Sequence, residues 1–451
     1  MAAIRYYNKR SQEHVDLVCM VVYTSAMGFL SQTFYPAIVC LALATSSCTT
    51  ALRQTRPVSE ELHPVAKPGQ VMPKWPERLP ATLPGITSKD GKAPVPLGTY
   101  GHCQVLSLSP GAKDPLLLIA SSTREPVRRG GKRLDFDLTV DEKHISRFVT
   151  THHRLTVVEL ESAWAAPVRG TVLYLGSIMG IARPEQRLIA TLRRDGWNVI
   201  ACLPPFQLSS EDIDLPVNGT EDLPGAAKRF AHDIDHHIAE RAYVAESAIA
   251  YVKSNRPDWL RGPTIVIGSS AGALALPAVV ERIGPVDAAV LVGGGANIPG
   301  VMLRSSLELV NPSMQAKQSG NREAGSRPLT RPELDRFETC ANEYMKLDPA
   351  CLAPVLDRTP TLLLLGTLDT IVPAENGVLL QKKLHNPEVW HYPVGHNLLM
   401  IALPSHAGKI RKWINTKYPP RITPSPIPYE KRPKIRVQFT DNTAPEKKKR
   451  R

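Results

Sequence analysis

The sequence lacks the spacings by which cysteine and histidine usually bind a metal. Seven cysteines occur among 451 residues, and none forms a C-x-x-C pair. Because structural zinc is held by thiolates and imidazoles at short, regular spacings, the sequence predicts no metal site. Cys340 and Cys351 lie eleven positions apart. In an exported protein they could form a disulfide, and a pair of reduced thiols is an equal alternative.

Strong charge of one sign is also missing from most of the chain. The formal net charge is +13, of which residues 421–451 contribute +7 through ten Lys/Arg and three Asp/Glu. The other 420 residues carry only +6, which indicates no specific nucleic-acid partner. The tail, 419–451, is rich in proline and ends in KKKRR. This composition predicts a basic disordered segment that could contact polyanions of the cell envelope by charge alone.

A phosphate-binding loop is absent as well. Gly293, Gly294 and Gly295 follow a strand-like run, but neither the P-loop lysine nor a complete G-x-G-x-x-G pattern accompanies them. The simpler interpretation of this glycine run is a tight turn.

Residues 1–48 have the composition of an export leader. Residues 15–44 are apolar, follow two basic residues and end in a cluster of small residues before Cys48, which is the order that a secretory signal needs. The closing LALATSSC resembles the lipobox of bacterial lipoproteins, and this implies a lipid on Cys48. Met27 as the true start and a membrane-spanning anchor stay open as alternatives. We expect an exported protein, either a lipoprotein of the cell membrane or outer membrane or a periplasmic protein.

The folded domain is expected over residues 99–418. Before it, residues 49–98 contain nine prolines and little apolar periodicity, which predicts an extended linker. The first part of the domain carries short apolar runs separated by Gly, Pro and charged residues. These runs favour antiparallel strands at 104–108, 116–120 and 155–160.

From residue 170 onwards, strand-like and helix-like patterns alternate. This alternation is typical of a parallel sheet with helices on both faces, and therefore of the α/β class. Strands are predicted at 171–176, 197–202, 264–268, 288–293, 361–366 and 388–392. Helices are predicted at 184–194, 226–254, 271–283, 374–385 and 397–416. Residues 301–358 interrupt the alternation with a polar, partly helical insertion, which predicts a lid over the active site.

The motif Gly268-Ser269-Ser270-Ala271-Gly272 joins a strand-like run to a helix-like run. A G-x-S-x-G motif alone is weak evidence, but this setting is the one that nucleophilic serines need. The glycines allow a sharp turn that projects the hydroxyl of the central residue, Ser270, above the sheet. Ser269 is the poorer candidate. The backbone N–H of Ala271 would then lie at a helix N-terminus, where it can stabilise an oxyanion.

A serine hydroxyl needs a base that takes its proton and an acid that orients the base. Asp369 follows the strand-like run TLLLLG, and His396 follows the next one. Since the carboxyl ends of parallel strands meet at one edge of a sheet, the sequence predicts Ser270, Asp369 and His396 as a catalytic triad. Ser177 or Ile178, after the strand at 171–176, would supply the second oxyanion N–H. This chemistry needs no cofactor.

Residues from about 165 to 416 resemble the α/β-hydrolase superfamily. The segments GTLDTIVPAENG and HYPVGHN are similar to the acid and histidine segments of its dienelactone hydrolase and prolyl oligopeptidase-like branch. The resemblance implies an eight-stranded, mostly parallel sheet whose first two strands come from residues 132–165.

We therefore expect an exported, membrane-tethered serine hydrolase that cleaves a carboxylic ester through an acyl-enzyme on Ser270. Its substrate would be a small-molecule or peptide acyl compound. Two alternatives stay open, namely a serine peptidase or amidase of the same fold and a catalytically silent binding protein that keeps the scaffold. His232 and His236 share one helical face and could bind a metal, but a solvated helix face is the favoured interpretation.

Overall fold

The computed structural model describes residues 75–78, 95–121, 137–140, 155–204, 223–307, 315–316, 327–420, 425–426 and 437–440. The chain divides into two compact units, 1–57 and 58–451, and every described residue belongs to the second. The predicted export leader and the predicted lipidation site at Cys48 therefore lie outside the described residues. None of the described helices combines the length and the apolar character that crossing a membrane requires.

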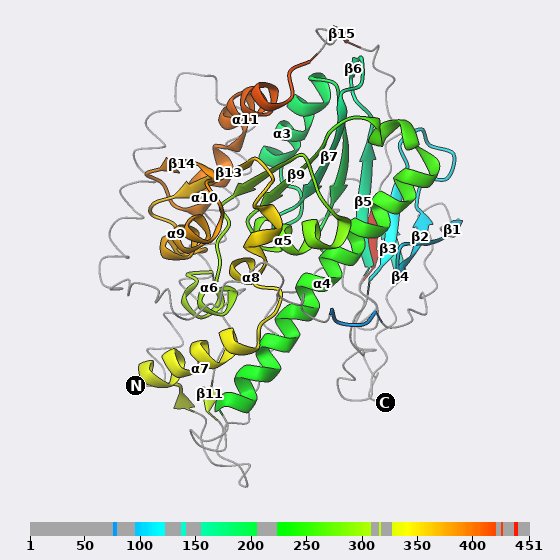
Figure 1. Cartoon of the computed structure of the whole chain (residues 1–451). Coiled ribbons are helices and arrows are strands. Elements are labelled where there is room, and N and C mark those ends of the chain that lie inside the picture. Colours follow the sequence, from blue (N-terminus) through cyan, green and yellow to red (C-terminus); the bar gives the residue numbers. More distant parts are fainter. Residues whose placement is uncertain are drawn as a thin grey trace, which may run out of the picture. The chain divides into compact units, whose positions relative to one another are not determined.

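A ten-stranded sheet lies at the centre of the described structure (Figure 1). In order across the sheet, its strands are β1 (Val95–Tyr100), β2 (Cys103–Ser107), β3 (Leu116–Ala120), β5 (Leu155–Glu161), β8 (Trp197–Cys202), β7 (Gly170–Leu175), β9 (Thr264–Ser269), β10 (Ala288–Val292), β13 (Thr361–Gly366) and β14 (Glu388–Tyr392). From β8 to β14 all neighbouring strands are parallel. The pairs from β1 to β8 are antiparallel.

The central strands form because their side chains are apolar on both faces. Every residue of β7, β8 and β13 is buried, as expected for parallel strands that are covered on both sides. Alternate residues of β7 enter different cores: Leu173 and Leu175 pack in one apolar cluster, and Val172 and Tyr174 pack in the other. The sheet therefore separates two hydrophobic cores.

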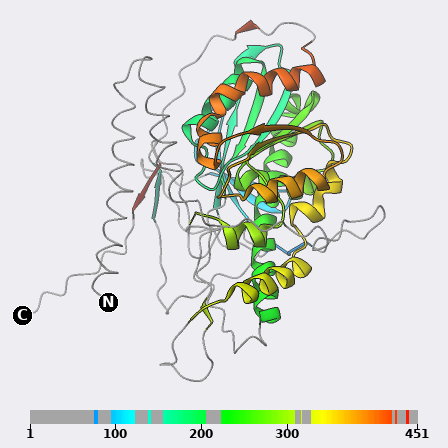
Figure 2. The same ribbon diagram turned by 90° about the vertical axis from the view of Figure 1, so that its left-hand side faces the viewer.

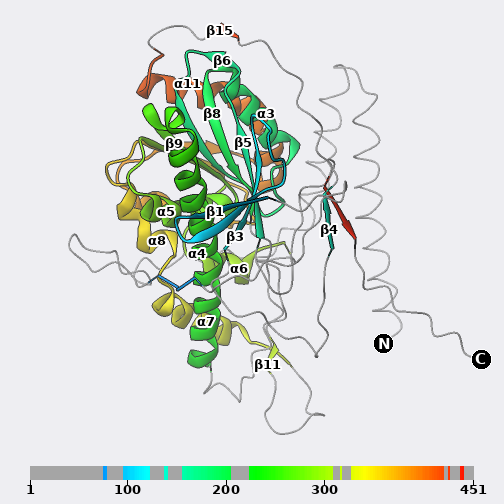
Figure 3. The same ribbon diagram turned by 90° about the vertical axis from the view of Figure 1, so that its right-hand side faces the viewer.

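Helices cover both faces of this sheet. They are α3 (Arg183–Arg194), α4 (Leu223–Asn255), α5 (Ala271–Ile283), α6 (Ile298–Arg304), α7 (Arg331–Tyr344), α8 (Pro349–Leu352), α9 (Ala374–Lys383), α10 (His396–Ile401) and α11 (Leu403–Lys417). Helices α4 and α5 belong to the first core, and α3 and α11 belong to the second. Figure 2 shows α11, in orange-red, along one face, and Figure 3 shows α4 and α5 on the other.

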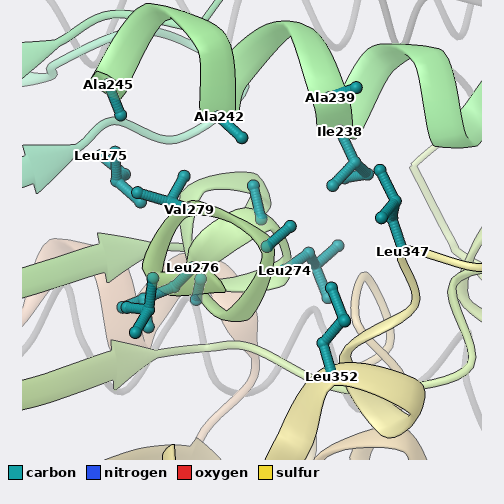
Figure 4. Close-up of a cluster of buried hydrophobic side chains, with 14 of the residues drawn as sticks. Leu175, Ile238, Ala239, Ala242, Ala245, Leu274, Leu276, Val279, Leu347 and Leu352 are labelled. Carbon is teal, nitrogen blue, oxygen red and sulfur yellow. The ribbon is translucent and has the colours of Figure 1, made fainter. Parts of the chain in front are cut away.

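Helices α4 and α5 pack closely because small side chains lie between them. Figure 4 shows Ala242 and Ala245 of α4 facing Leu175 of β7 and Val279 of α5. Without large side chains at these positions, the long helix α4 approaches both α5 and the end of β7. This packing brings α4 to the edge of the sheet where the candidate site lies.

The predicted strands and helices from residue 170 onwards are found, and the strand bounds shift by no more than one residue. One helix differs. The stretch predicted as a single helix at 397–416 is divided into α10 and α11 at Ala402. Pro404, in the first turn of α11, lacks the N–H that a continuous helix would use there.

The number of strands predicted from the resemblance is wrong, because the sheet has ten strands and not eight. The hairpin of β1 and β2 adds two strands at the antiparallel edge. The origin of the first strands is also corrected. Of residues 132–165, β5 joins the sheet, whereas β4 (Asp137–Val140) pairs with β16 (Val437–Thr440) outside it. The neighbour of β5 on this side of the large sheet is β3.

The segment predicted as a linker, 49–98, contacts the folded domain where it is described. Trp75 packs edge-on against Tyr243 of α4 at 6.0 Å between ring centroids, and the Tyr243 hydroxyl donates to the carbonyl of Pro76 at 2.9 Å. Strand β1 begins at Val95, within the predicted linker. A purely extended spacer is therefore wrong for these residues.

Two pieces of the tail predicted to be disordered, 419–451, form strands. The first, β15 (Ser425–Pro426), pairs with β6 (Ala165–Ala166), and the second is β16. Local composition does not reveal these pairings, because their partners lie more than 250 residues earlier in the chain.

The predicted insertion at 301–358 is described at 301–307, 315–316 and 327–358. Helix α7 packs against α4, with the rings of Phe337 and Phe230 5.3 Å apart. At the start of the insertion, Leu307 packs against Ile178 and Ala271. The first residues of the insertion thus lie beside the candidate site, and a lid role for the rest stays a prediction.

Candidate active site

The turn between β9 and α5 holds Ser270 in an unusual backbone conformation. Its φ is 52° and its ψ is −118°, a region that residues with a Cβ rarely adopt. The turn is also crowded. A Cβ on Gly268 would lie 2.6 Å from the Gly272 carbonyl oxygen, and a Cβ on Gly272 would lie 2.1 Å from the Leu175 carbonyl oxygen. Both glycines are therefore required for the sharp strand-to-helix turn.

The structure brings Ser270, Asp369 and His396 together. His396 Nε2 lies 2.9 Å from Ser270 Oγ, and His396 Nδ1 lies 2.7 Å from Asp369 Oδ2. All three side chains are buried. Asp369 follows β13 and His396 follows β14, so two parallel crossovers place their side chains beside the serine. The imidazole can accept the serine proton on one nitrogen while the carboxylate accepts a hydrogen bond from the other.

The carboxylate of Asp369 is held in place from its other side. Its Oδ1 atom accepts hydrogen bonds from the backbone N–H groups of Ile371 and Val372, both at 2.9 Å. Bonds of this kind stabilise the charged form of a carboxylate. These bonds fix the carboxylate so that its Oδ2 atom points at His396 Nδ1. The hydrogen bond between them then orients the histidine ring.

The glycine run bends the chain at Gly293, directly after β10, and this bend lies beside the histidine. Gly293 has a φ of +60°, and a Cβ built on it would lie 3.0 Å from His396 Cε1. This position therefore leaves room for the imidazole. One feature of the sequence could have placed Gly293 near the site, because this residue directly follows a buried parallel strand, β10.

The candidate oxyanion N–H groups lie in the turn after β9 and in the loop after β7. Ala271 is the first residue of α5, and the first N–H groups of a helix have no partner within it. In the loop after β7, the Ser177 N–H donates to Glu185 Oε1 at 3.2 Å. The Ile178 N–H has no hydrogen-bond partner within the described ranges. Of the two residues that the sequence left open, Ile178 is therefore the better donor.

A buried polar chain lies beneath this site, and the sequence did not reveal it. Glu185 of α3 accepts from the Ala182 N–H at 2.7 Å and from the Tyr174 hydroxyl at 3.3 Å. The Tyr174 hydroxyl in turn lies 2.5 Å from Ser269 Oγ. Burial raises the pKa of Glu185 to about 7. Ser269 thus points into this chain and not toward His396.

The other residues that the sequence singled out lie apart from the triad. His232 and His236 are neighbours on α4, with their Nε2 atoms 3.2 Å apart. Within the described ranges, no group of three His, Cys, Asp or Glu side chains is arranged to hold a metal ion. Cys340 and Cys351 are both free thiols, so the disulfide alternative is not the one found.

No protein-family model matches this sequence, and no curated protein does. Several solved structures are similar. Est1E from Butyrivibrio proteoclasticus is 11% identical over 58% of this chain and 94% of its own, with a TM-score of 0.38. The esterase Pf2001 from Pyrococcus furiosus is 14% identical over 66% and 98%, with a TM-score of 0.37. Acetyl xylan esterase 1 from Thermoanaerobacterium sp. is 12% identical over 67% and 87%, with a TM-score of 0.39. At these scores, the assignment of the fold rests on this chain's own strand order and triad.

Proposed function

We propose that this chain, whose nucleophile turn and Ser–Asp–His order are those of the α/β-hydrolase superfamily, is a serine hydrolase that cleaves a carboxylic ester. The observation that carries the proposal is the position of His396, which lies within hydrogen-bond distance of Ser270 Oγ and Asp369 Oδ2 at once. A serine that served only for packing would need no buried histidine and carboxylate aligned behind it. The positive φ of Ser270 supports the same conclusion.

Acylation would begin with the Ser270 hydroxyl. His396 Nε2 takes its proton while Oγ forms a bond to the carbonyl carbon of the ester, and the carbonyl electron pair moves onto the oxygen. The N–H groups of Ala271 and Ile178 donate to that oxyanion. When the carbon–oxygen double bond re-forms, the bond to the alcohol breaks, and the alcohol leaves with the proton from His396.

Deacylation repeats these steps with water. His396 takes a proton from a water molecule, and the resulting nucleophile attacks the acyl carbon. The oxyanion forms at the same two N–H groups. Its collapse breaks the bond to Ser270 Oγ, which recovers the proton from His396. Asp369 accepts the hydrogen bond from His396 Nδ1 and stabilises the imidazolium that forms in both steps.

An ester is favoured over an amide because an alcohol is the better leaving group. A peptidase of the same fold uses the same triad, so the choice depends on the substrate pocket. The narrower resemblance to the dienelactone hydrolase and prolyl oligopeptidase-like branch also stays a prediction. A silent binding protein is the less favoured alternative, since it would need no such alignment of three buried side chains.

The decisive experiment combines a fluorophosphonate probe with a substrate panel on the full chain. We expect the wild type to be labelled at Ser270 and to hydrolyse acyl esters faster than aminoacyl amides. Ser270→Ala should abolish labelling and turnover. Ser269→Ala should still be labelled, because its hydroxyl contacts Tyr174 and not His396. If folded wild-type protein neither reacts with the probe nor turns over any ester, the silent-scaffold alternative replaces the proposal.

The expected location of the enzyme also stays a proposal. We propose that residues 1–48 direct export and that a lipid on Cys48 tethers the enzyme to a membrane. Mass spectrometry should then find a mature N-terminus at Cys48, and Cys48→Ala should release the protein from membranes. Membrane association that persists in this variant would favour a spanning anchor instead.

A further inference from the structure

The peptide group between Gly176 and Ser177 is held from both sides by buried ionisable side chains. It lies directly after β7, in the loop that leads to Ile178. The loop closes on itself through two hydrogen bonds of 3.0 Å, one from the Gly180 N–H to the Ser177 carbonyl and one from Ser177 Oγ to the Gly180 carbonyl. The orientation of this peptide group therefore influences the direction of the next N–H, that of Ile178.

The carbonyl of this peptide group is held by Arg241. From α4, Arg241 Nη1 donates to the Gly176 carbonyl oxygen at 3.2 Å. Burial lowers the pKa of Arg241 to about 10, so its guanidinium is still charged at neutral pH. Among the described residues no carboxylate pairs with it. Arg241 therefore uses its guanidinium to hold the loop after β7.

The N–H of the same peptide group is held by Glu185. Its Oε1 atom accepts from the Ser177 N–H at 3.2 Å, and its Oε2 atom lies 3.4 Å from Ser177 Oγ. Glu185 comes from α3, on the opposite face of the sheet from α4. The two ionisable groups therefore approach one peptide group from opposite faces of the sheet.

Glu185 also connects to the other half of the oxyanion site. Its Oε1 atom accepts from the Tyr174 hydroxyl, which contacts Ser269 Oγ at 2.5 Å. Ser269 directly precedes Ser270 and Ala271. A single buried carboxylate is thus linked to the loop that carries Ile178 and to the turn that carries Ala271.

We propose that Glu185 and Arg241 are positioning residues that clamp the Gly176–Ser177 peptide, so that the Ile178 N–H faces the oxyanion. The inference rests on the proposed function, because it assigns a role only if an oxyanion forms at this site. Burying an ionisable side chain away from water lowers stability unless a partner compensates. Apolar side chains could fill the same space, so two polar groups that hold the N–H and the carbonyl of one peptide group are explained by the orientation that they enforce.

The first test replaces Glu185 by Gln. A glutamine amide has one acceptor oxygen and an NH₂ group, so it cannot accept from all the donors around Glu185. We expect kcat for an oxygen ester to fall about 10- to 100-fold, less than the effect of losing an oxyanion donor outright, while KM changes by less than about threefold. Glu338→Gln is the matched control. It removes a buried carboxylate that contacts Asn297 and Arg304, both at 2.7 Å, and not the oxyanion loop.

A thionoester substrate separates positioning from general destabilisation. Its sulfur accepts hydrogen bonds poorly, so a well-aligned oxyanion site favours the oxygen ester strongly. If the clamp aligns Ile178, Glu185→Gln and Arg241→Met should reduce the rate ratio of oxygen ester to thionoester, and Glu338→Gln should leave that ratio unchanged. Arg241→Lys keeps the charge and one donor, and it should restore part of the rate that Arg241→Met loses.

The outcomes distinguish the two proposals. An inactive, unlabelled wild type contradicts the proposed function itself. An active wild type whose Glu185→Gln and Arg241→Met variants are folded, and keep both kcat and the thionoester ratio, overturns the clamp alone. If a variant fails to fold by circular dichroism, Tyr174→Phe provides the remaining test, because it removes only the hydroxyl between Glu185 and Ser269. In that variant the thionoester ratio should still fall, and an unchanged ratio contradicts the link to the turn.

Discussion

The parallel and antiparallel halves of the sheet both contribute buried strands to the core, but they differ in chemistry. Ser270 follows β9, Asp369 follows β13 and His396 follows β14, and these three strands belong to the parallel half. In the antiparallel half, β2 and β3 contribute mostly buried residues to the core. None of the described residues of that half forms a hydrogen bond with a triad side chain.

The difference follows from how the strands are connected. Parallel strands need crossovers, so all their carboxyl ends lie at one edge of the sheet, and the loops that leave this edge converge. Antiparallel neighbours present alternate ends to each edge, so consecutive loops diverge. Side chains from residues 270, 369 and 396 can meet only in the first arrangement. The antiparallel half then serves mainly to complete the core.

The largest expected effect is the loss of a triad member from the parallel half. We expect His396→Ala to reduce kcat/KM about 10⁴-fold or more, as Ser270→Ala does, because the two side chains act as a unit. Asp369→Asn should be milder, since it disturbs the histidine tautomer without removing the base. Steady-state kinetics on an activated ester measures these losses. If one of these variants keeps wild-type kinetics, the residue that it replaces has no role in the mechanism.

A smaller but still large effect is expected from the crowded turn. Gly272→Ala would place a methyl group 2.1 Å from the Leu175 carbonyl oxygen, so the turn must move, and both activity and stability should fall. Gly408→Ala in α11 is the matched control, because a Cβ there meets no atom within 4 Å. It should stabilise the protein by up to about 1 kcal/mol. Chemical denaturation and ester kinetics of both variants test this contrast, and equal behaviour would contradict it.

The antiparallel half should respond in stability alone. Leu117 in β3 is fully buried, and Leu117→Ala should lower the free energy of unfolding by about 2–5 kcal/mol. We expect kcat of the folded fraction to stay within about twofold of the wild type, because no hydrogen bond connects β3 to the triad. A large loss of kcat at a temperature where the variant is fully folded would show that the two halves are coupled.

The smallest expected effect on catalysis comes from Asp235, which should instead make stability depend on pH. Burial raises the pKa of this carboxyl from 3.8 to about 7, although it accepts hydrogen bonds from the backbone N–H groups of Lys346 and Leu347. Since the folded-state pKa is the higher one, the folded protein binds the extra proton. Asp235 therefore contributes its full share to the free energy of unfolding below about pH 4, and this contribution is lost as the pH rises toward about 7.

The variant Asp235→Asn isolates this contribution. Urea unfolding of both proteins between pH 4 and pH 7.5 should show that the wild type loses on the order of a few kcal/mol more than the variant over this range. Ester turnover at a fixed pH should change little, because Asp235 contacts the segment after α7 and not the triad. Parallel stability curves for the two proteins would contradict the raised pKa.

The sequence predicted the parallel half well because its signals are local. A buried parallel strand is a short apolar run bounded by Gly, Pro or charge, and this pattern located β13 with its bounds. The run at 388–392 also has the predicted bounds, but β14 is an edge strand that is only partly buried. The residues directly after these runs, Asp369 and His396, could then be placed at one edge without knowing the order of the strands. In the antiparallel half the same reasoning found β2, β3 and β5 but not β1. The resemblance misassigned the first strands to residues 132–165, since pairing depends on partners distant in sequence.

The sequence by itself therefore determined the α/β class, the turn at Ser270 and the chain order of the triad, because each depends on a pattern of a few neighbouring residues. Tertiary structure alone decided that, among the described residues, the N–H of Ile178 and not that of Ser177 lacks a hydrogen-bond partner, and that Glu185 and Arg241 hold the same peptide group. In the sequence, Glu185 is an ordinary acidic residue in the first turn of a helix, and Arg241 lies 65 positions from the carbonyl that it contacts. The role of a buried charge depends on what surrounds it, and only packing brings those neighbours together.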